Sequence, residues 1–497
     1  MTSERRRLVL GASWTVASTI VALAVGAIFN PVLVLYLGVE GYGIWASAIA
    51  IASLIGLGGD LGVASALTKI VAGRRGLDQG VGSLVSSALV IGIFAGIAAG
   101  AGLAVLARFI GQYFAYNQFA LLLELQAIQM PLNLGASSLM GVIQGKREFR
   151  PLAFFTMGQS VSNLLVAVGL LALGLGIPGV MIGALATSAV VFSLLVVSMK
   201  GDLGFAGFGK FRKDFRQLIV FGLNVTATNA LSTLLYSVDL VAVSILIRTP
   251  TIVGAYALAV FITRALWILP TSISTTTYPV VSEYSAAVDR RRVSKYLTTA
   301  LSVSIALTGI LSSSLILFGR PLTRLVFGAD SIRAYEIALI LLPGTAILGS
   351  LRSVAPSLAA VGRPDIGLRI SALGAGALTI LASLTASTSG ATGVAASVSV
   401  IFVMVSIILF WALNHYVLHD TRGLLASRNV TMTVGLAIAT GAGSILMALP
   451  SEFDTLQFVL GAGFWILTGF AMTWASGGMD TWGTLIQRSS KVQFDRS

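Results

Sequence analysis

The sequence predicts an all-α polytopic membrane protein, with about 14 transmembrane helices arranged as two six-helix lobes plus two extra C-terminal helices. Three observations lead to this fold class. The 497 residues are 56% hydrophobic and only 10% charged, whereas soluble domains are roughly 25% charged. Apolar runs of about 20 residues, the length needed to span a bilayer, recur along the chain. Basic residues also collect in alternate connections between these runs.

Fourteen apolar segments meet the length criterion. The first follows MTSERRR; its apolar run is too long for a secretory signal and no convincing cleavage site follows, so we interpret it as a permanent span. The predicted spans are 8–36, 42–70, 81–107, 114–144, 151–173, 177–199, 217–247, 253–284, 296–318, 334–361, 367–388, 391–416, 430–449 and 455–476. Short Gly-rich segments, GLGIPG and STSGATG, join the fifth to the sixth and the eleventh to the twelfth, which is typical of tight turns.

The distribution of basic residues predicts the orientation. With the N-terminus in the cytoplasm, 25 of the 32 Lys and Arg residues fall in cytoplasmic segments and five on the opposite side. Lys and Arg collect in short cytoplasmic loops of membrane proteins, so we expect a cell (cytoplasmic) membrane protein with both termini cytoplasmic. The net charge of +13 is then a topology signal and a contact for anionic membrane lipids. We expect no nucleic acid partner.

An internal repeat organises the predicted spans. A shift of 211 residues places Gly11 on Gly222, Gly43 on Gly254, Ala46 on Ala257, Ala48 on Ala259 and Trp45 on Tyr256. Six spans separate the copies, so both enter from the same side and form a parallel repeat. We therefore expect an N-terminal lobe at 1–200 (spans 1–6), a C-terminal lobe at 201–422 (spans 7–12), and spans 13–14 with a cytoplasmic tail at 423–497. Transporters with two such lobes bind substrate between them and rock to give alternating access.

Several stretches resemble the polysaccharide-transport branch of the multidrug/oligosaccharidyl-lipid/polysaccharide flippase superfamily. They are LGVEGYGIWASAIAI (37–51), GDLGVASALTKIVA (59–72), GVIQGKREFR (141–150), VGAYALAVFI (253–262), YPVVSEYSA (278–286), LFGRPLTRLVFG (317–328) and LAAVGRPD (358–365). The resemblance implies two six-helix lobes in a V shape around a cavity that contains cationic residues. It also implies movement of lipid-linked saccharides from the inner to the outer leaflet.

Two arginines lie within predicted spans, Arg264 in the eighth and Arg352 in the tenth. An arginine at mid-bilayer costs roughly 2.5–3.5 kcal/mol on insertion scales, and such charges commonly mark functional sites. Guanidinium groups suit phosphate through bidentate, charge-assisted hydrogen bonds, so both are candidates for binding a pyrophosphate headgroup. The alternative is that each arginine pairs with an intramembrane acid and ties helices together, with Asp239 as the obvious partner of Arg264.

The acidic candidates are Asp60 and Asp239, either as ion-coupling groups or in structural roles. Asp60 follows GLGG, a sequence that could break the second span. Pro270 and Pro279 are expected to interrupt the eighth span, and Pro343 and Pro356 the tenth, because proline removes a backbone donor. Broken helices are tolerated where they line protein or a watery cavity, which favours a cavity location for both arginines.

Amide side chains in two spans could hydrogen-bond sugar hydroxyls. Asn133 lies in the fourth span together with Gln126, Gln129 and Gln144, and Asn224 and Asn229 lie in the seventh. Hydrogen bonding between helices is the alternative role. The chain has no cysteine, and His415 and His419 have no third ligand nearby, so we expect no metal site and no cofactor.

The leading hypothesis is a flippase for a polyprenyl-pyrophosphate-linked oligosaccharide in polysaccharide biosynthesis, with membrane lipids and the glycosyltransferases or polymerase of the same pathway as partners. A cation-coupled multidrug antiporter of the same superfamily is the first alternative, and it predicts acidic rather than basic cavity groups. A lipid II flippase is the second. An enzyme such as a membrane glycosyltransferase would need a sizeable external loop or soluble domain, which the short loops exclude.

Overall fold

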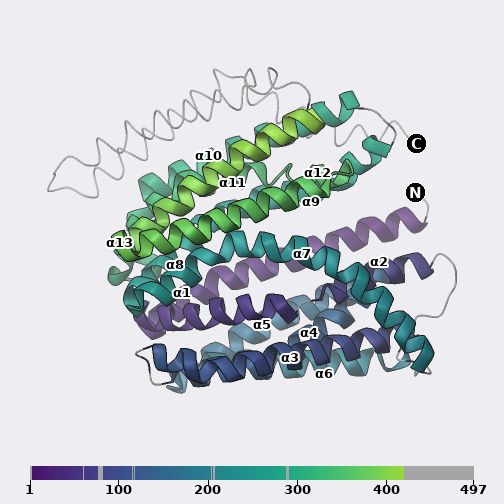
Figure 1. Cartoon of the computed structure of the whole chain (residues 1–497), viewed down its shortest axis with the longest axis horizontal. Coiled ribbons are helices and arrows are strands. Elements are labelled where there is room, and N and C mark those ends of the chain that lie inside the picture. The colour runs from purple at the N-terminus through teal and green to yellow at the C-terminus, as the bar shows by residue number, and fades with distance from the viewer. Residues whose placement is uncertain are drawn as a thin grey trace. The chain divides into compact units, whose positions relative to one another are not determined.

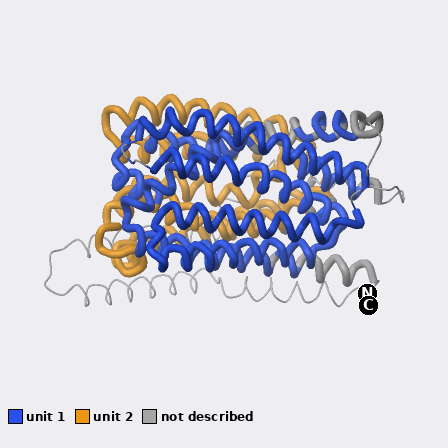
Figure 2. The backbone as a smooth tube through the Cα atoms, turned by 90° about the horizontal axis from the view of Figure 1, so that it is seen from below, with its two compact units in different colours: residues 1–257 blue, residues 258–497 orange. Residues whose placement is uncertain are grey.

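A computed structural model describes residues 3–59, 61–75, 82–114, 116, 118–202, 204, 208–286 and 290–418, and these residues contain helices and no strand. The prediction of an all-α fold is confirmed. The backbone groups into two compact units, residues 1–257 and 258–497 (Figure 2). The expected division into lobes at 200 and 422 stays a prediction.

Unit 1 is a bundle in which α3 packs along α4, and α5 packs along both α1 and α6 (Figure 1). Its elements are α1 (Ser3–Gly59), α2 (Val63–Arg75), α3 (Gly82–Tyr113), α4 (Phe119–Gly145), α5 (Phe149–Ala172), α6 (Gly176–Ser198), the 3-10 helix η1 (Lys200–Asp202), α7 (Phe208–Ile247) and the first part of α8 (Pro250–Arg264).

Helix α1 contains the first predicted span and most of the second, and it reverses at Gly38. The backbone there has φ 68° and ψ 174°, a conformation that glycine adopts without the penalty of a Cβ atom. The rings of Phe29 and Trp45 lie 5.9 Å apart, although a straight helix would separate them by about 24 Å. The Tyr42 hydroxyl also donates a 2.8 Å hydrogen bond to Asn30 Oδ1. The two arms of α1 therefore pack against each other.

Unit 2 begins with the last residues of α8, and α13 packs along α11 within it. The remaining elements are η2 (Ala265–Trp267), α9 (Ile268–Ala286), α10 (Arg290–Phe327), η3 (Ala329–Ser331), α11 (Ile332–Leu351), α12 (Ser357–Ala360), α13 (Pro364–Leu413) and the π-helix η4 (Asn414–Leu418). Helix α13 turns at Gly390, where φ is 62°, and Thr385 Oγ1 lies 2.9 Å from Ser397 Oγ across the turn. The predicted tight turn at STSGATG is thus present.

Nine helical segments of the described residues are long and apolar enough to cross a membrane. This number supports a multi-pass membrane protein. The thirteenth and fourteenth predicted spans lie outside the described residues, so the count of fourteen stays a prediction.

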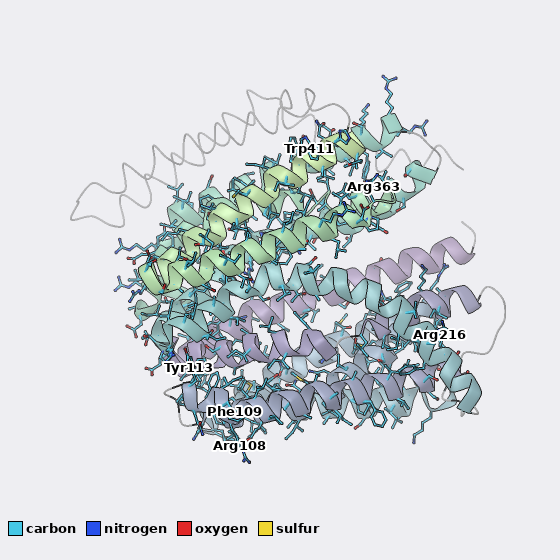
Figure 3. The ribbon with its side chains drawn as sticks, in the orientation of Figure 1. Arg108, Phe109, Tyr113, Arg216, Arg363 and Trp411 are labelled. Atoms are coloured by element: carbon cyan, nitrogen blue, oxygen red, sulfur yellow. The ribbon has the colours of Figure 1, made fainter. Side chains whose placement is uncertain are left out.

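The two ends of unit 1 differ in character. At one end Lys146 forms an ion pair with Asp202, and the Arg150 guanidinium lies 5.8 Å from the Trp14 ring. Figure 3 shows Arg216 at this end and Arg108 and Tyr113 at the opposite one. The described basic residues of two connections assigned to the cytoplasm, Lys146 and Arg150 in one and Arg216 in the other, therefore lie on one side of unit 1, as the orientation requires. That this side faces the cytoplasm remains a prediction.

Small residues bring α3 close to α4. A Cβ atom at Gly96 would lie 2.4 Å from the Cα atom of Pro131, and one at Gly100 would lie 2.4 Å from the carbonyl oxygen of Ala127. Close approach through small residues at every fourth position is a common way to pack transmembrane helices. This contact fixes one side of α4 against α3 and leaves another side for the polar groups described below.

Candidate functional site

Both predicted intramembrane arginines lie where a helix breaks. Helix α8 ends at Arg264, a 3-10 segment follows at Ala265–Trp267, and α9 begins at Ile268. Pro270 has no backbone N–H to donate to the carbonyl of Leu266, which accounts for the irregular geometry before it. In the same unit, α11 ends at Leu351, and residues 352–356 form turns before α12.

The indole of Trp267 brings the two arginines together. The Arg264 guanidinium carbon lies 5.6 Å from the centre of the Trp267 ring, and the Arg352 guanidinium carbon lies 4.6 Å from it. Trp267 Nε1 donates a 2.8 Å hydrogen bond to the carbonyl oxygen of Thr345. A Cβ atom at Gly349 would lie 2.5 Å from the indole, so the ring lies directly on the backbone of α11.

This geometry explains how the membrane segment accommodates two half-buried guanidinium groups. Arg264 is the last residue of α8, and Arg352 directly follows α11. The C-terminal end of a helix carries partial negative charge that stabilises a cation by about 0.3–1 kcal/mol. An aromatic face within about 6 Å adds roughly 0.5–2 kcal/mol. Together these effects offset much of the insertion cost of each arginine.

Asp239 is fully buried in α7 and accepts a 3.1 Å hydrogen bond from the Tyr256 hydroxyl. This bond ties α7 to α8 within unit 1, as the structural alternative for Asp239 predicts. The predicted pairing of Asp239 with Arg264 stays a prediction. Asp60 lies outside the described residues, but α1 ends at Gly59 and α2 begins at Val63. The break expected at GLGG is therefore present.

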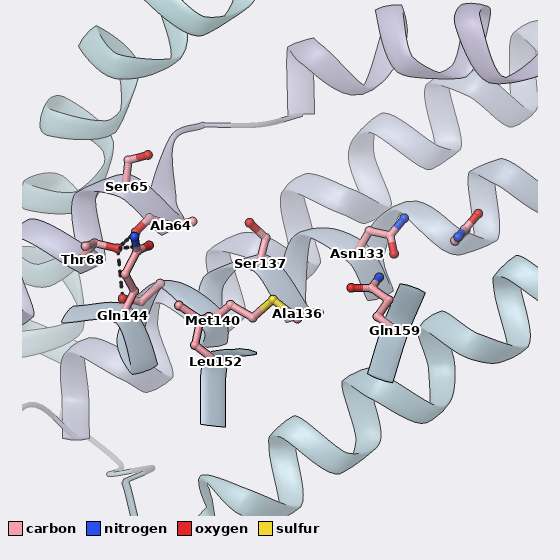
Figure 4. Close-up of a pocket in the computed structure, with 12 residues that line it drawn as sticks. Ala64, Ser65, Thr68, Asn133, Ala136, Ser137, Met140, Gln144, Leu152 and Gln159 are labelled. Carbon is pink, nitrogen blue, oxygen red and sulfur yellow. Dashed lines mark hydrogen bonds between the residues drawn. The ribbon is translucent and has the colours of Figure 1, made fainter. Parts of the chain in front are cut away.

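A polar pocket of about 580 Å³ lies within unit 1 (Figure 4). Residues of α2, α4 and α5 line it: Ala64, Ser65, Thr68, Gln129, Asn133, Ala136, Ser137, Met140, Gly141, Gln144, Leu152 and Gln159. The pocket thus contains the predicted Asn133 together with Gln129 and Gln144. None of the twelve lining residues is charged.

Two lining side chains hold the pocket together. Gln129 Nε2 donates to Ser188 Oγ at 2.9 Å and to the Ala184 carbonyl at 3.3 Å, which joins α4 to α6. Thr68 Oγ1 lies 3.0 Å from the Gly141 carbonyl oxygen and 3.4 Å from Gln144 Oε1, which joins α2 to α4. For Gln129 the structure therefore favours the interhelical alternative.

The structure describes only some of the remaining candidates. Asn224 and Asn229 belong to α7, but their side chains lie outside the described part of the chain. His415 stacks on Trp411 with 5.5 Å between ring centres, and His419 lies outside the described residues. Pro343 does not interrupt its helix but lies inside α11.

Sequence reasoning missed Trp267, Gln159 and the residues of α2 in the pocket. Trp267 lies three residues after Arg264, a spacing that places side chains on one helix face, and this signal could have identified it. Gln159 and Ser65 carry no such signal, because they reach the pocket only through the packing of α2 and α5 around α4.

A family model described as "Polysaccharide biosynthesis protein" matches residues 8–285, which is more than half of the chain, and the MatE family model matches residues 225–385. The chain belongs to the polysaccharide biosynthesis protein family. Membership places it in the multidrug/oligosaccharidyl-lipid/polysaccharide flippase superfamily, whose members are membrane transporters rather than enzymes.

Solved structures share the fold of this family member. The lipid II flippase MurJ in an inward closed conformation is 16% identical with a TM-score of 0.71, over 94% of this chain and 99% of that one. The multidrug transporter DinF-BH in complex with R6G is 18% identical with a TM-score of 0.61, over 84% and 97%. A superfamily transporter from Pyrococcus furiosus, described as having a binding pocket of reversed polarity, is 13% identical with a TM-score of 0.57, over 81% and 94%. A search of curated proteins found no match.

Proposed function

We propose that this transporter is a flippase that moves a polyprenyl-pyrophosphate-linked oligosaccharide across the cytoplasmic membrane for polysaccharide biosynthesis. The observation that carries the proposal is the convergence of Arg264 and Arg352 on Trp267, at two helix breaks within apolar segments. Membership of the polysaccharide biosynthesis family and the fold shared with a lipid II flippase support it.

The paired guanidinium groups suit a diphosphate. The two distances to the Trp267 ring limit the separation of the guanidinium carbons to about 10 Å. Each planar guanidinium can offer two parallel N–H donors to phosphate oxygens, and these charge-assisted bonds are roughly twice as strong as neutral ones. A headgroup with two linked phosphates could thus contact both arginines while its polyprenyl tail stays in lipid.

In this proposal, rocking of the lobes presents the headgroup first to the inner and then to the outer leaflet, as in other two-lobe transporters. A glycosyltransferase reaction on the cytoplasmic side must supply the lipid-linked saccharide. A polymerase or transferase on the other side must consume it. Enzymes of these classes are the expected pathway partners.

A cation-coupled multidrug antiporter is the second candidate, favoured by the MatE match and by the shared fold of DinF-BH. Binding of a cationic drug in a low-dielectric site calls for a nearby carboxylate. Among the described side chains, the charged groups that lie on the Trp267 ring are guanidiniums, and the Asp239 carboxylate is fully buried and accepts a hydrogen bond from Tyr256. These observations favour an anionic cargo.

The test is a flipping assay with the full-length protein in proteoliposomes and a fluorescent polyprenyl-pyrophosphate oligosaccharide. We expect Arg264→Ala and Arg352→Ala each to reduce the rate about tenfold or more, the effect of losing one hydrogen bond to a charged group. Arg369→Ala is the matched control, because its side chain is 77% exposed beside Asp365. Wild-type rates in both cluster variants, at equal reconstitution, would contradict the proposal.

A further inference from the structure

The pocket of unit 1 has a chemistry different from that of the arginine cluster. Its polar side chains are amides and hydroxyls, and none of its twelve lining residues carries a charge. We propose that this pocket binds the uncharged sugar units of the cargo and selects them against sugars that carry a carboxylate or an ammonium group. The inference rests on the proposed function, which supplies a saccharide as cargo.

The first argument is the polar side of α4. Asn133, Ser137 and Gln144 are exposed on one side of this helix, at spacings of four and seven residues that repeat the helical turn. The amide and hydroxyl groups of a membrane-spanning helix are costly to leave against hydrocarbon without partners. The polar groups of these residues therefore need a hydrogen-bonding partner in the pocket, either water or a ligand.

The second argument is the unused hydrogen-bonding capacity around the pocket. Within the described part of the chain, the side chains of Asn133, Ser137 and Gln159 make no hydrogen bond, in contrast to Gln129 and Thr68. Each amide offers two donors and an acceptor oxygen. Sugar hydroxyl groups likewise donate and accept, so a saccharide can satisfy the amides from both helices at once. In Figure 4 Asn133 and Gln159 lie near each other on α4 and α5.

The third argument concerns charge. A carboxylate bound in this pocket would meet no cation among the described lining residues, whereas sugar hydroxyl groups would meet amide and hydroxyl partners there. The same holds for an ammonium group. The pocket should therefore favour uncharged sugars over charged ones, because it would leave the charge of a carboxylate or ammonium group unpaired. Specific sites reject wrong ligands in the same way.

Size and position fit the same conclusion. The volume of about 580 Å³ lies within the range of roughly 300–1,000 Å³ that is typical of small-molecule sites. Gln144 lies next to the end of α4, two residues before Lys146, whose ion pair with Asp202 marks the basic end of unit 1. Gln129 lies about 22 Å deeper along α4. A saccharide would thus approach from the predicted cytoplasmic end.

The test measures binding of soluble probes to the full-length protein in lipid nanodiscs. The probes are an uncharged trisaccharide of N-acetylglucosamine, a trisaccharide containing glucuronic acid, and inorganic pyrophosphate. We expect the uncharged trisaccharide to bind at least about tenfold more tightly than the acidic one. The double variant Asn133→Leu/Gln159→Leu should weaken that binding about tenfold, because it removes several hydrogen bonds, and should leave pyrophosphate binding unchanged.

Gln126→Leu is the matched control. Gln126 is also an amide of α4, but its Nε2 atom lies 3.2 Å from Met181 Sδ and it does not line the pocket, so its loss should not change saccharide binding. If the double variant folds poorly, Asn133→Arg provides a second test. Its added cation should raise affinity for the acidic trisaccharide and remove the preference for the uncharged one.

The outcomes separate the two proposals. Saccharide binding that is unchanged in the double variant, or equal affinity of the wild-type protein for both trisaccharides, overturns the sugar pocket. Pyrophosphate binding that survives Arg264→Ala and Arg352→Ala overturns the proposed headgroup site instead, and leaves the result for the pocket standing.

Discussion

Gly43 and Gly254, two residues that the 211-residue repeat makes equivalent, pack directly against each other in unit 1. A Cβ atom at Gly43 would lie 2.6 Å from the backbone nitrogen of Gly254, and one at Gly254 would lie 1.9 Å from the carbonyl oxygen of Val39. Contacts between equivalent residues are expected where two-fold related copies meet. The packing therefore supports the repeat in the second arm of α1 and in α8.

This contact predicts a large effect from a single methyl group. Gly254→Ala should destabilise the protein by about 1–3 kcal/mol or more, because the Cβ atom would overlap backbone that has no rotamer to change. The measurement is the thermal unfolding temperature in detergent. Gly158→Ala is the control, since no atom lies within 4 Å of a Cβ atom at that position. Equal unfolding temperatures in the two variants would contradict the close packing of α8 on α1.

Trp267 is expected to act as a positioning residue for both arginines. Trp267→Phe keeps an aromatic face but loses the hydrogen bond to the Thr345 carbonyl, and should cost about 1–2 kcal/mol of stability. Trp267→Leu also removes the ring from Arg264 and Arg352, so flipping should fall further than in the Phe variant. Proteoliposome flipping at matched protein amounts is the measurement. The control is Trp411→Leu, because Trp411 is 62% exposed in α13. Full flipping by the Leu variant would remove Trp267 from the site.

Arg264→Lys separates phosphate binding from a purely structural role. A lysine keeps the positive charge at the end of α8, so stability should stay within about 0.5 kcal/mol of the wild type. It loses the bidentate fork of the guanidinium, so flipping should fall roughly tenfold, the value of about one charge-assisted hydrogen bond. If lysine supports the wild-type rate, only the charge at the helix end matters.

The predicted orientation can be checked by single-cysteine labelling, because the chain has no native cysteine. One cysteine is introduced by Gly201→Cys, at the basic end of unit 1 beside the ion pair of Lys146 with Asp202. The other is introduced by Asp330→Cys, in η3 on the predicted outer side. A membrane-impermeant maleimide added to intact cells should label the cysteine at 330 and not the one at 201. The reverse pattern would place both termini outside.

The sequence predicted local features of the fold better than it predicted the partners of its candidate residues. Glycine and proline change the conformation of the backbone at their own positions. The turn at Gly390 and the helix breaks before Val63 and near Pro270 could therefore be inferred from the local sequence. Pro343 was expected to interrupt its span but lies within α11. One missing donor does not end a helix whose other groups remain bonded.

The candidate sites depended on contacts between residues distant in the chain. The location of Arg264 and Arg352 within apolar segments is visible in the sequence. Their meeting at Trp267 could not be predicted, since it requires the indole to pack on Gly349 of another helix. Likewise Asn133 was a visible amide in an apolar span, whereas Gln159 joins it only through the packing of α5 beside α4.

The contact of one indole with two cations links the two arginines thermodynamically. A change in either guanidinium alters the field and packing that the other experiences through the Trp267 ring, so the losses caused by Arg264→Ala and Arg352→Ala should not add in the double variant. A change in the preference of this protein for its lipid cargo would therefore require joint substitution of Arg264, Trp267 and Arg352. In natural relatives we expect these three residues to change together.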